Sequence, residues 1–116
     1  MLQTEVTQTS QVTNALKKLG FSASKLGFYY MRECIILLIN EPSKIDNVIS
    51  EVAAKSSLDF VNVKKAIKKS IKETRTYGDR ELWNKIFSKD YTNGTLKIST
   101  LDFISILTDK IKTGEL

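Results

Sequence analysis

The sequence predicts an all-α protein, a compact bundle of about six helices, and three features support this. Apolar residues recur at spacings of three and four along most segments, which places them on one face of a helix. Residues that start helices, such as Asp79 and Ser99, stand just before two of these segments. Isolated glycines and the single proline, Pro42, fall where segments end. The chain has 116 residues, 41% of them hydrophobic, which suits one domain with a substantial core.

A short first helix is predicted over Ser10–Leu19, and Gly20 is well placed to end it in a left-handed conformation. Its apolar face repeats at i, i+3, i+4 and i+7 through Val12, Ala15, Leu16 and Leu19. Residues Met1–Thr9 are rich in Thr and Gln and are expected to fray. We therefore expect residues 1–18 to form a polar N-terminal tail and short helix, and residues 19–116 to form the main domain.

The most apolar part of the chain, Phe21–Asn40, is predicted to be one central helix that is buried on most sides. Ser22 or Ser24 is expected to cap its start, and Pro42 to enforce its end. The run Cys34–Ile39 taken alone would also suit a buried strand. A helix is favoured because no turn signal separates this run from the segment before it.

Polar and aromatic side chains of the central segment are assigned structural roles. Phe28, Tyr29 and Tyr30 are expected to pack in the core or at its edge rather than to stack on bases. Arg32 and Glu33 point about 100° apart on a helix, so each is expected to pair with another element.

The next two segments have the pattern of a helix, a tight turn and a longer helix. Ser43 is expected to cap a helix over Lys44–Lys55, and Ser56-Ser57 to form the turn. Asp59 can cap the second helix, which is predicted over Phe60–Thr76. This order matches a helix-turn-helix, in which the first helix supports the second.

Small and apolar residues in the first of these helices fit that motif. Ala53 and Ala54 would let the two helices approach closely, and Ile49 and Val52 would face the second helix. The turn departs from the usual pattern, since Ser57 stands where glycine is preferred.

The second helix divides into an apolar face and a strongly basic face. The apolar face contains Phe60, Val63, Ala66, Ile67, Ser70, Ile71 and Thr74. The basic face contains Val61, Lys65, Lys68, Lys69 and Lys72, flanked by Asn62, Lys64 and Arg75. No acidic residue interrupts it between Asp59 and Glu73. From these residues alone three interpretations stay open: a solvated face, a nucleic-acid contact, or a contact with a membrane or acidic protein surface.

Three further features follow along the chain. Asp79 is expected to cap a short helix over Arg80–Ser88, in which Trp83 is either a core residue or a surface contact. The pair Asn93-Gly94 favours a turn and leaves a small hairpin possible within Asp90–Lys97. Ser99, with Asp102 three residues later, resembles a capping box that starts the last helix, Thr100–Lys112.

Composition excludes several classes of function. The chain has no histidine and one cysteine, which excludes zinc sites and histidine-based nucleophilic catalysis. With no glycine-rich phosphate loop and no well-spaced carboxylate pair, we expect no enzyme, no cofactor and no metal. Cys34 is interpreted as a small buried side chain in a reduced, cytoplasmic protein. No signal peptide or membrane-spanning run is found, and the net charge of +5 favours an anionic partner.

The segment from Leu19 to Ile35, LGFSASKLGFYYMRECI, closely resembles the start of a known domain family. The family is the C-terminal effector domain of the sporulation master regulator, stage-zero sporulation protein A. The matching residues in this part are Gly20, Ala23, Gly27, Tyr30, Arg32, Glu33 and Ile35, followed by Asn40. Weaker matches are Val52, Ala53, Val63, Ala66, Ile67, Ile71, Phe87, Phe103, Asp109 and Lys110. The resemblance covers Leu19–Lys112, about four-fifths of the chain.

This resemblance implies a six-helix DNA-binding domain that recognises short promoter boxes, often as tandem copies, and contacts the sigma subunit of RNA polymerase. Family members normally carry an N-terminal receiver domain, whereas about 18 residues precede the match here, which favours a stand-alone relative. Between Asn40 and Ala53 the chain is about four residues shorter than the family pattern, so the helix before the motif is expected to be truncated or merged.

The family's base-reading positions, Arg, Glu and Arg in R-V-E-R-A-I, are replaced here by Asn62, Lys64 and Lys65. Asparagine favours adenine, and lysine binds phosphate or guanine less selectively than arginine does. We therefore expect DNA binding with an altered and looser sequence preference.

The sequence as a whole predicts a transcription regulator that binds double-stranded DNA, with the second helix of the motif in the major groove. The expected base contacts are Val61, Asn62, Lys65 and Lys68. The expected phosphate contacts are Lys64, Lys69, Lys72 and Arg75. A dimer on DNA is compatible with this prediction.

Two alternatives stay open. One is an interaction protein, a co-regulator or antagonist of a full-length response regulator or RNA polymerase, with Trp83 as a protein contact. The other is a mobile-element accessory protein that uses the same DNA contact at another kind of site.

Overall fold

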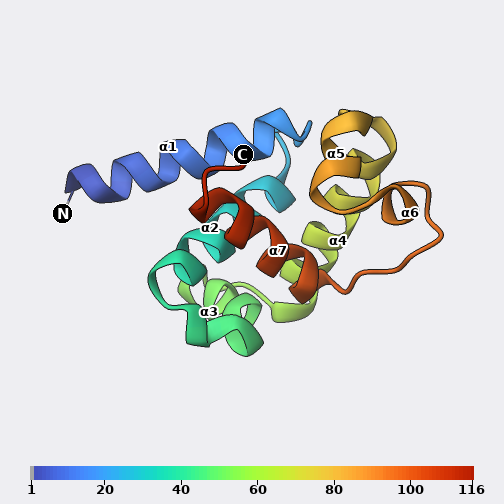
Figure 1. Cartoon of the computed structure of the whole chain (residues 1–116). Coiled ribbons are helices and arrows are strands. Elements are labelled where there is room, and N and C mark those ends of the chain that lie inside the picture. Colours follow the sequence, from blue (N-terminus) through green and yellow to red (C-terminus); the bar gives the residue numbers. More distant parts are fainter. Residues whose placement is uncertain (1) are drawn as a thin grey trace.

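The computed structural model of the chain describes residues 2–116, with side chains from residue 7 onward. These residues form seven α-helices and one 3₁₀ helix, and no strand (Figure 1). The elements in order are α1 (Leu2–Lys18), α2 (Leu26–Asn40), η1 (Pro42–Asn47), α3 (Val48–Lys55), α4 (Phe60–Tyr77), α5 (Arg80–Ile86), α6 (Lys89–Thr92) and α7 (Thr100–Lys112). The predicted all-α bundle with a helix-turn-helix is confirmed.

Helix α2 lies at the centre of the bundle and contacts α1, η1, α3, α4 and α7. Its side chains are buried on most sides, including those of Met31, Cys34 and Ile35, none of which is accessible to solvent. The helical interpretation of the apolar run is therefore confirmed over the strand alternative. Because α4 and α7 both pack on α2, this one element positions the helix that carries the basic face.

The start of the chain differs from the prediction. Helix α1 begins at Leu2 rather than Ser10, so residues that were expected to fray are helical. Met1 lies outside the described residues. The second half of α1 joins the common core through Val12, Ala15 and Leu16. Gly20 ends the helix with φ of +99°, as predicted, and the Phe21 amide donates to the Leu16 carbonyl.

Two predicted caps in the first half of the chain are wrong. Helix α2 begins only at Leu26, so its N-cap residue is Lys25, and no side chain caps this helix. The hydroxyls of Ser22 and Ser24 bond to each other instead. Ser43 does not start an α-helix, since Pro42–Asn47 forms the 3₁₀ helix η1 and α3 begins only at Val48. Lys44 of η1 is tied to Glu51 of α3 by an ion pair of 2.6 Å, which raises the pKa of Lys44.

Arg32 and Glu33 fit the prediction only in part, since the Arg32 guanidinium donates to the Thr13 hydroxyl of α1 at 3.5 Å. They pair with each other, the Arg32 Nε lying 3.5 Å from a Glu33 carboxylate oxygen. Neighbouring helix positions diverge at the backbone, but the long arginine side chain can turn back to reach its neighbour. Arg32 also lies 5.3 Å from the centre of the Tyr29 ring, which is partly exposed, whereas Phe28 and Tyr30 are buried.

The C-terminal third confirms two predicted caps and excludes the hairpin. The Asp79 carboxylate accepts from the Leu82 amide, and the Ser99 hydroxyl accepts from the Asp102 amide, so α5 and α7 begin where expected. Asn93-Gly94 follows the short helix α6 and leads into an extended connection to α7 rather than a second strand (Figure 1).

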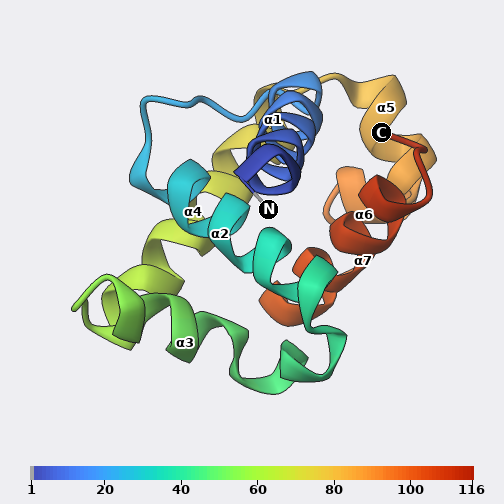
Figure 2. The same ribbon diagram turned by 90° about the vertical axis from the view of Figure 1, so that its left-hand side faces the viewer.

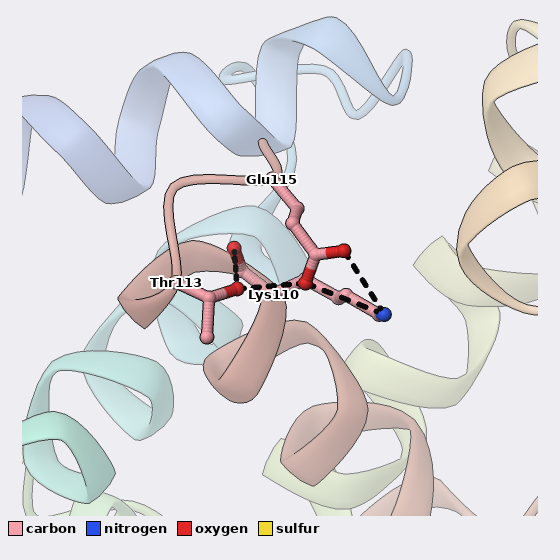
Figure 3. A network of polar contacts seen from close by, with 3 residues as sticks. All are labelled: Lys110, Thr113 and Glu115. Atoms are coloured by element: carbon pink, nitrogen blue, oxygen red, sulfur yellow. Dashed lines mark hydrogen bonds and ion pairs between the residues drawn. The ribbon is translucent and has the colours of Figure 1, made fainter.

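The end of α7 is held by a small polar network (Figure 3). The Thr113 hydroxyl lies 2.7 Å from one Glu115 carboxylate oxygen. The Lys110 ammonium lies 3.4 Å from the same oxygen and 3.5 Å from the other. Both neighbours lower the pKa of Glu115, the threonine hydrogen bond contributing most. Within residues 2–116, no helix has the length and apolar character needed to cross a lipid bilayer.

Candidate nucleic-acid interface

The turn between α3 and α4 occupies one corner of the molecule (Figure 2). The Leu58 amide donates to the Ala53 carbonyl and the Ser57 amide to the Ala54 carbonyl, which together form a Schellman motif. Ser57 takes the left-handed position of this motif, with φ of +55°. Gly20, Gly94 and Gly114 hold the equivalent position after α1, α6 and α7. The turn is therefore a standard helix end, with serine where glycine is preferred.

Helix α3 supports α4 much as the motif requires. Ile49, Val52 and Ala53 are buried, and α3 contacts both α2 and α4. Ala54 is exposed, so the expectation that it lies at the helix crossing is wrong, whereas Ala53 is buried. Asp59 is the N-cap residue of α4, but its side chain makes no capping hydrogen bond.

The two faces of α4 divide as predicted along most of its length. Val63, Ile67, Ser70, Ile71 and Thr74 are buried against the core. Val61, Asn62, Lys64, Lys65, Lys68, Lys69 and Lys72 are exposed. The four predicted base contacts and three of the predicted phosphate contacts therefore lie on the solvent side of one helix. Lys69 has a distant partner in Glu73, at 4.0 Å.

Arg75, the fourth predicted phosphate contact, is half-buried. Its guanidinium lies 5.3 Å from the centre of the Tyr91 ring. Burial raises the pKa of Tyr91, while the charge of Arg75 acts in the opposite direction. The arginine is therefore held against α6, in contrast to the lysines that extend into solvent.

Two apolar side chains near the start of α4, those of Leu58 and Phe60, were not predicted to be accessible. Phe60 was placed on the buried face, yet 41% of it is exposed, and Leu58 in the turn is 44% exposed. The rotation per residue predicts on which side of the helix a side chain lies, but it does not predict how far the end of the helix extends beyond the core. Lys64 lies over the Phe60 ring at 5.9 Å. An apolar tip of Leu58, Phe60 and Val61 thus adjoins the lysines.

Trp83 cannot act as a surface anchor, which corrects the prediction that it is a protein contact. The residue is fully buried, and its indole N–H donates to the Leu19 carbonyl at 2.8 Å. Phe21, Phe87, Tyr91 and Phe103 surround it.

Two observations concern catalytic and metal chemistry. Cys34 is buried in α2, and desolvation, aided by the charge of Glu33, raises the pKa of its thiol to about 12. Across residues 2–116, no three His, Cys, Asp or Glu side chains gather where they could hold a metal ion.

A known protein family matches most of this chain. The family described as "Sporulation initiation factor Spo0A C terminal" matches residues 12–111, nearly the whole chain. This family is a DNA-binding effector domain of a transcription regulator. The match begins within α1 and ends in α7, so it includes α3, the turn and α4. The chain therefore belongs to the family of Spo0A C-terminal domains.

Proposed function

We propose that this protein is a sequence-specific regulator of transcription that inserts α4 into the major groove of double-stranded DNA. The observation that carries the proposal is the run of five exposed lysines from Lys64 to Lys72, on the side of α4 opposite the core. A duplex presents closely spaced phosphates, so such a run provides affinity, and the motif provides the geometry.

Side chains near the start of α4 are the proposed base contacts, because the recognition helix of this motif reads bases with its N-terminal part. Val61 can contact a thymine methyl group, Asn62 can bind adenine, and Lys65 and Lys68 can bind guanine. Lys64, Lys69, Lys72 and Arg75 would bind phosphates and fix the register. Since the arginine and glutamate positions of the family pattern are Asn62, Lys64 and Lys65 here, the target box should differ from that of the family.

An electrophoretic titration with duplexes selected from a random pool tests this proposal. Lys65→Ala is expected to weaken binding by about 1–3 kcal/mol if the side chain reads a base. Lys112→Ala is the matched control, since this exposed lysine lies at the end of α7. If neither Lys65→Ala nor Lys68→Ala weakens binding relative to that control, groove docking by α4 is wrong.

Salt dependence provides a second test of the phosphate contacts. Four to six contacts between cationic side chains and phosphates should reduce the affinity about 10²–10³-fold between 50 and 200 mM salt. A shallow dependence would contradict this part of the proposal even if binding itself were observed.

Contact with the sigma subunit and dimer formation on DNA are further proposals that rest on the family. The alternative of a protein-interaction regulator would need an anchor other than Trp83, because that side chain is buried. A mobile-element role would use the same α4 surface, and the identity of the selected site would separate it from promoter binding.

A further inference from the structure

A groove of about 430 Å³ lies beside the basic face of α4. One wall is the C-terminal half of α4, and the other is the connection from α6 to α7 with the first turn of α7. Its volume falls within the range of about 300–1,000 Å³ that is usual for small-molecule sites. The groove shares Lys68 with the proposed base-reading surface, whose other residues lie toward the start of α4.

The floor of this groove is apolar and firmly supported. It contains Ile71, Tyr91, Ile98 and Phe103. Phe103 and Tyr91 are buried members of the aromatic cluster, with ring centres 6.2 Å apart. Because these rings are packed from behind, the floor is preformed and would not need to rearrange around a ligand.

The rim of the groove is cationic, with Lys68, Lys69, Lys72, Arg75 and Lys97 lining it. Among the described residues that line it, none is acidic. Among the described residues, a carboxylate lies within 4.0 Å of only one of these cations, Lys69, whose partner is Glu73. Like charges gathered around an apolar surface repel one another, so an anion placed among them is favoured.

We propose that the groove binds an organic anion with an apolar body, such as an aryl or alkyl carboxylate, sulfonate or phosphate. The apolar body would rest on Ile98, which is partly exposed, above the buried ring of Phe103. The charged group would lie among the rim cations. Lys97 approaches from the α6–α7 connection, opposite α4, so the anion would be held from both walls.

One consequence rests on the proposed function. Lys68 and Lys72 line the groove and are also proposed DNA contacts, so an anion in the groove would compete with DNA for them. The groove would then let a small molecule control DNA binding.

The direct test uses two probes that share an aromatic body and differ in charge. Anilinonaphthalenesulfonate is anionic, and N-phenylnaphthylamine is neutral; both report binding by fluorescence. Lys97→Glu should weaken the anionic probe about fivefold or more, because an attraction becomes a repulsion, and leave the neutral probe unchanged. Lys112→Glu changes the net charge equally but lies outside the groove, and should leave both probes within about twofold.

A second variant tests the floor. Ile98→Ser should weaken both probes, because it removes apolar contact without changing charge. Equal responses to Lys97→Glu and Lys112→Glu, or an unchanged affinity of both probes for Ile98→Ser, would overturn the assignment of this groove.

Addition of a random duplex to the wild-type protein separates the groove from the proposed function. Displacement of the anionic probe supports competition for the shared lysines. If the protein binds the duplex and still retains the probe, the inferred competition between the anion and DNA is wrong. If the variants change probe binding as expected but the protein binds no duplex, the proposed function is wrong and the groove is still assigned as an anion site.

Discussion

Gly27 of α2 lies directly against Ser70 of α4, at the crossing of the central helix and the helix that carries the basic face. A Cβ atom at position 27 would lie 2.8 Å from the Ser70 Cβ and would also meet the Ser70 hydroxyl and the Ala66 carbonyl oxygen. Such a separation is well below van der Waals contact. The close approach of these two helices therefore depends on glycine at one position and a small residue at the other.

Gly27→Ala is expected to destabilise the fold by about 1–3 kcal/mol, because α4 must move away from α2 or distort. Urea denaturation of the purified protein measures this. Ser70→Gly in the same chain should recover part of the loss, although glycine within a helix itself costs about 1 kcal/mol. Strictly additive effects in this double-mutant cycle would mean that the two residues do not limit the helix separation.

Ser57→Gly is expected to stabilise the protein by up to about 1 kcal/mol. Ser57 has φ of +55°, a conformation that costs an L-residue about 1–2 kcal/mol relative to glycine, partly offset by the greater freedom of glycine in the unfolded chain. Thermal unfolding provides the measurement. Ser56→Gly is the matched control, since its φ of −91° gives glycine no advantage. A decrease in stability for Ser57→Gly would show that the serine side chain has a stabilising contact that outweighs the strain.

Helix ends with a local chemical cause could be predicted from the sequence, and those without one could not. The start of α7 at Thr100 could be predicted because the Ser99 hydroxyl accepts from the Asp102 amide, three residues later in the chain. Gly20 ends α1 because only the local backbone conformation is involved. By contrast, the choice between a 3₁₀ helix and an α-helix after Pro42 depends on packing of η1 against α2 and α7. The residues of this segment alone do not indicate that packing.

The candidate site also has features that the sequence predicts and features that depend on tertiary structure. Helical periodicity placed Lys65 and Lys68 on the solvent side correctly, because the angle around a helix follows from residue spacing alone. Exposure of Phe60 depends on where the core ends along the helix axis, which spacing does not give. Lys97 was not identified as a site residue, since it lies in a connection and joins the groove only through tertiary structure.

Glu115 is expected to titrate below the ordinary glutamate value of 4.5, because the Thr113 hydroxyl and then the Lys110 ammonium favour its charged form. The carboxylate therefore contributes to holding the end of α7 above about pH 4.5, and this contribution is lost as the pH falls through the lowered pKa. NMR titration of the side-chain carboxyl carbon measures this directly. Thr113→Ala should raise the pKa of Glu115, whereas Thr95→Ala, in the α6–α7 connection, should leave it unchanged. An identical titration in the wild type and Thr113→Ala would contradict the assigned hydrogen bond.

Trp83→Phe is expected to destabilise the fold by at least about 1–3 kcal/mol. The indole N–H donates to the Leu19 carbonyl in a buried hydrogen bond of 2.8 Å that joins the segment after α1 to α5. Phenylalanine keeps an aromatic ring among Phe21, Phe87 and Phe103 but leaves that carbonyl without its donor and leaves space where the indole was. Denaturant unfolding followed by circular dichroism measures the loss. Tyr77→Phe is the control, since Tyr77 is 86% exposed and its replacement should have little effect. Equal stability of Trp83→Phe and the wild type would mean that the hydrogen bond from the indole to the Leu19 carbonyl does not stabilise the fold.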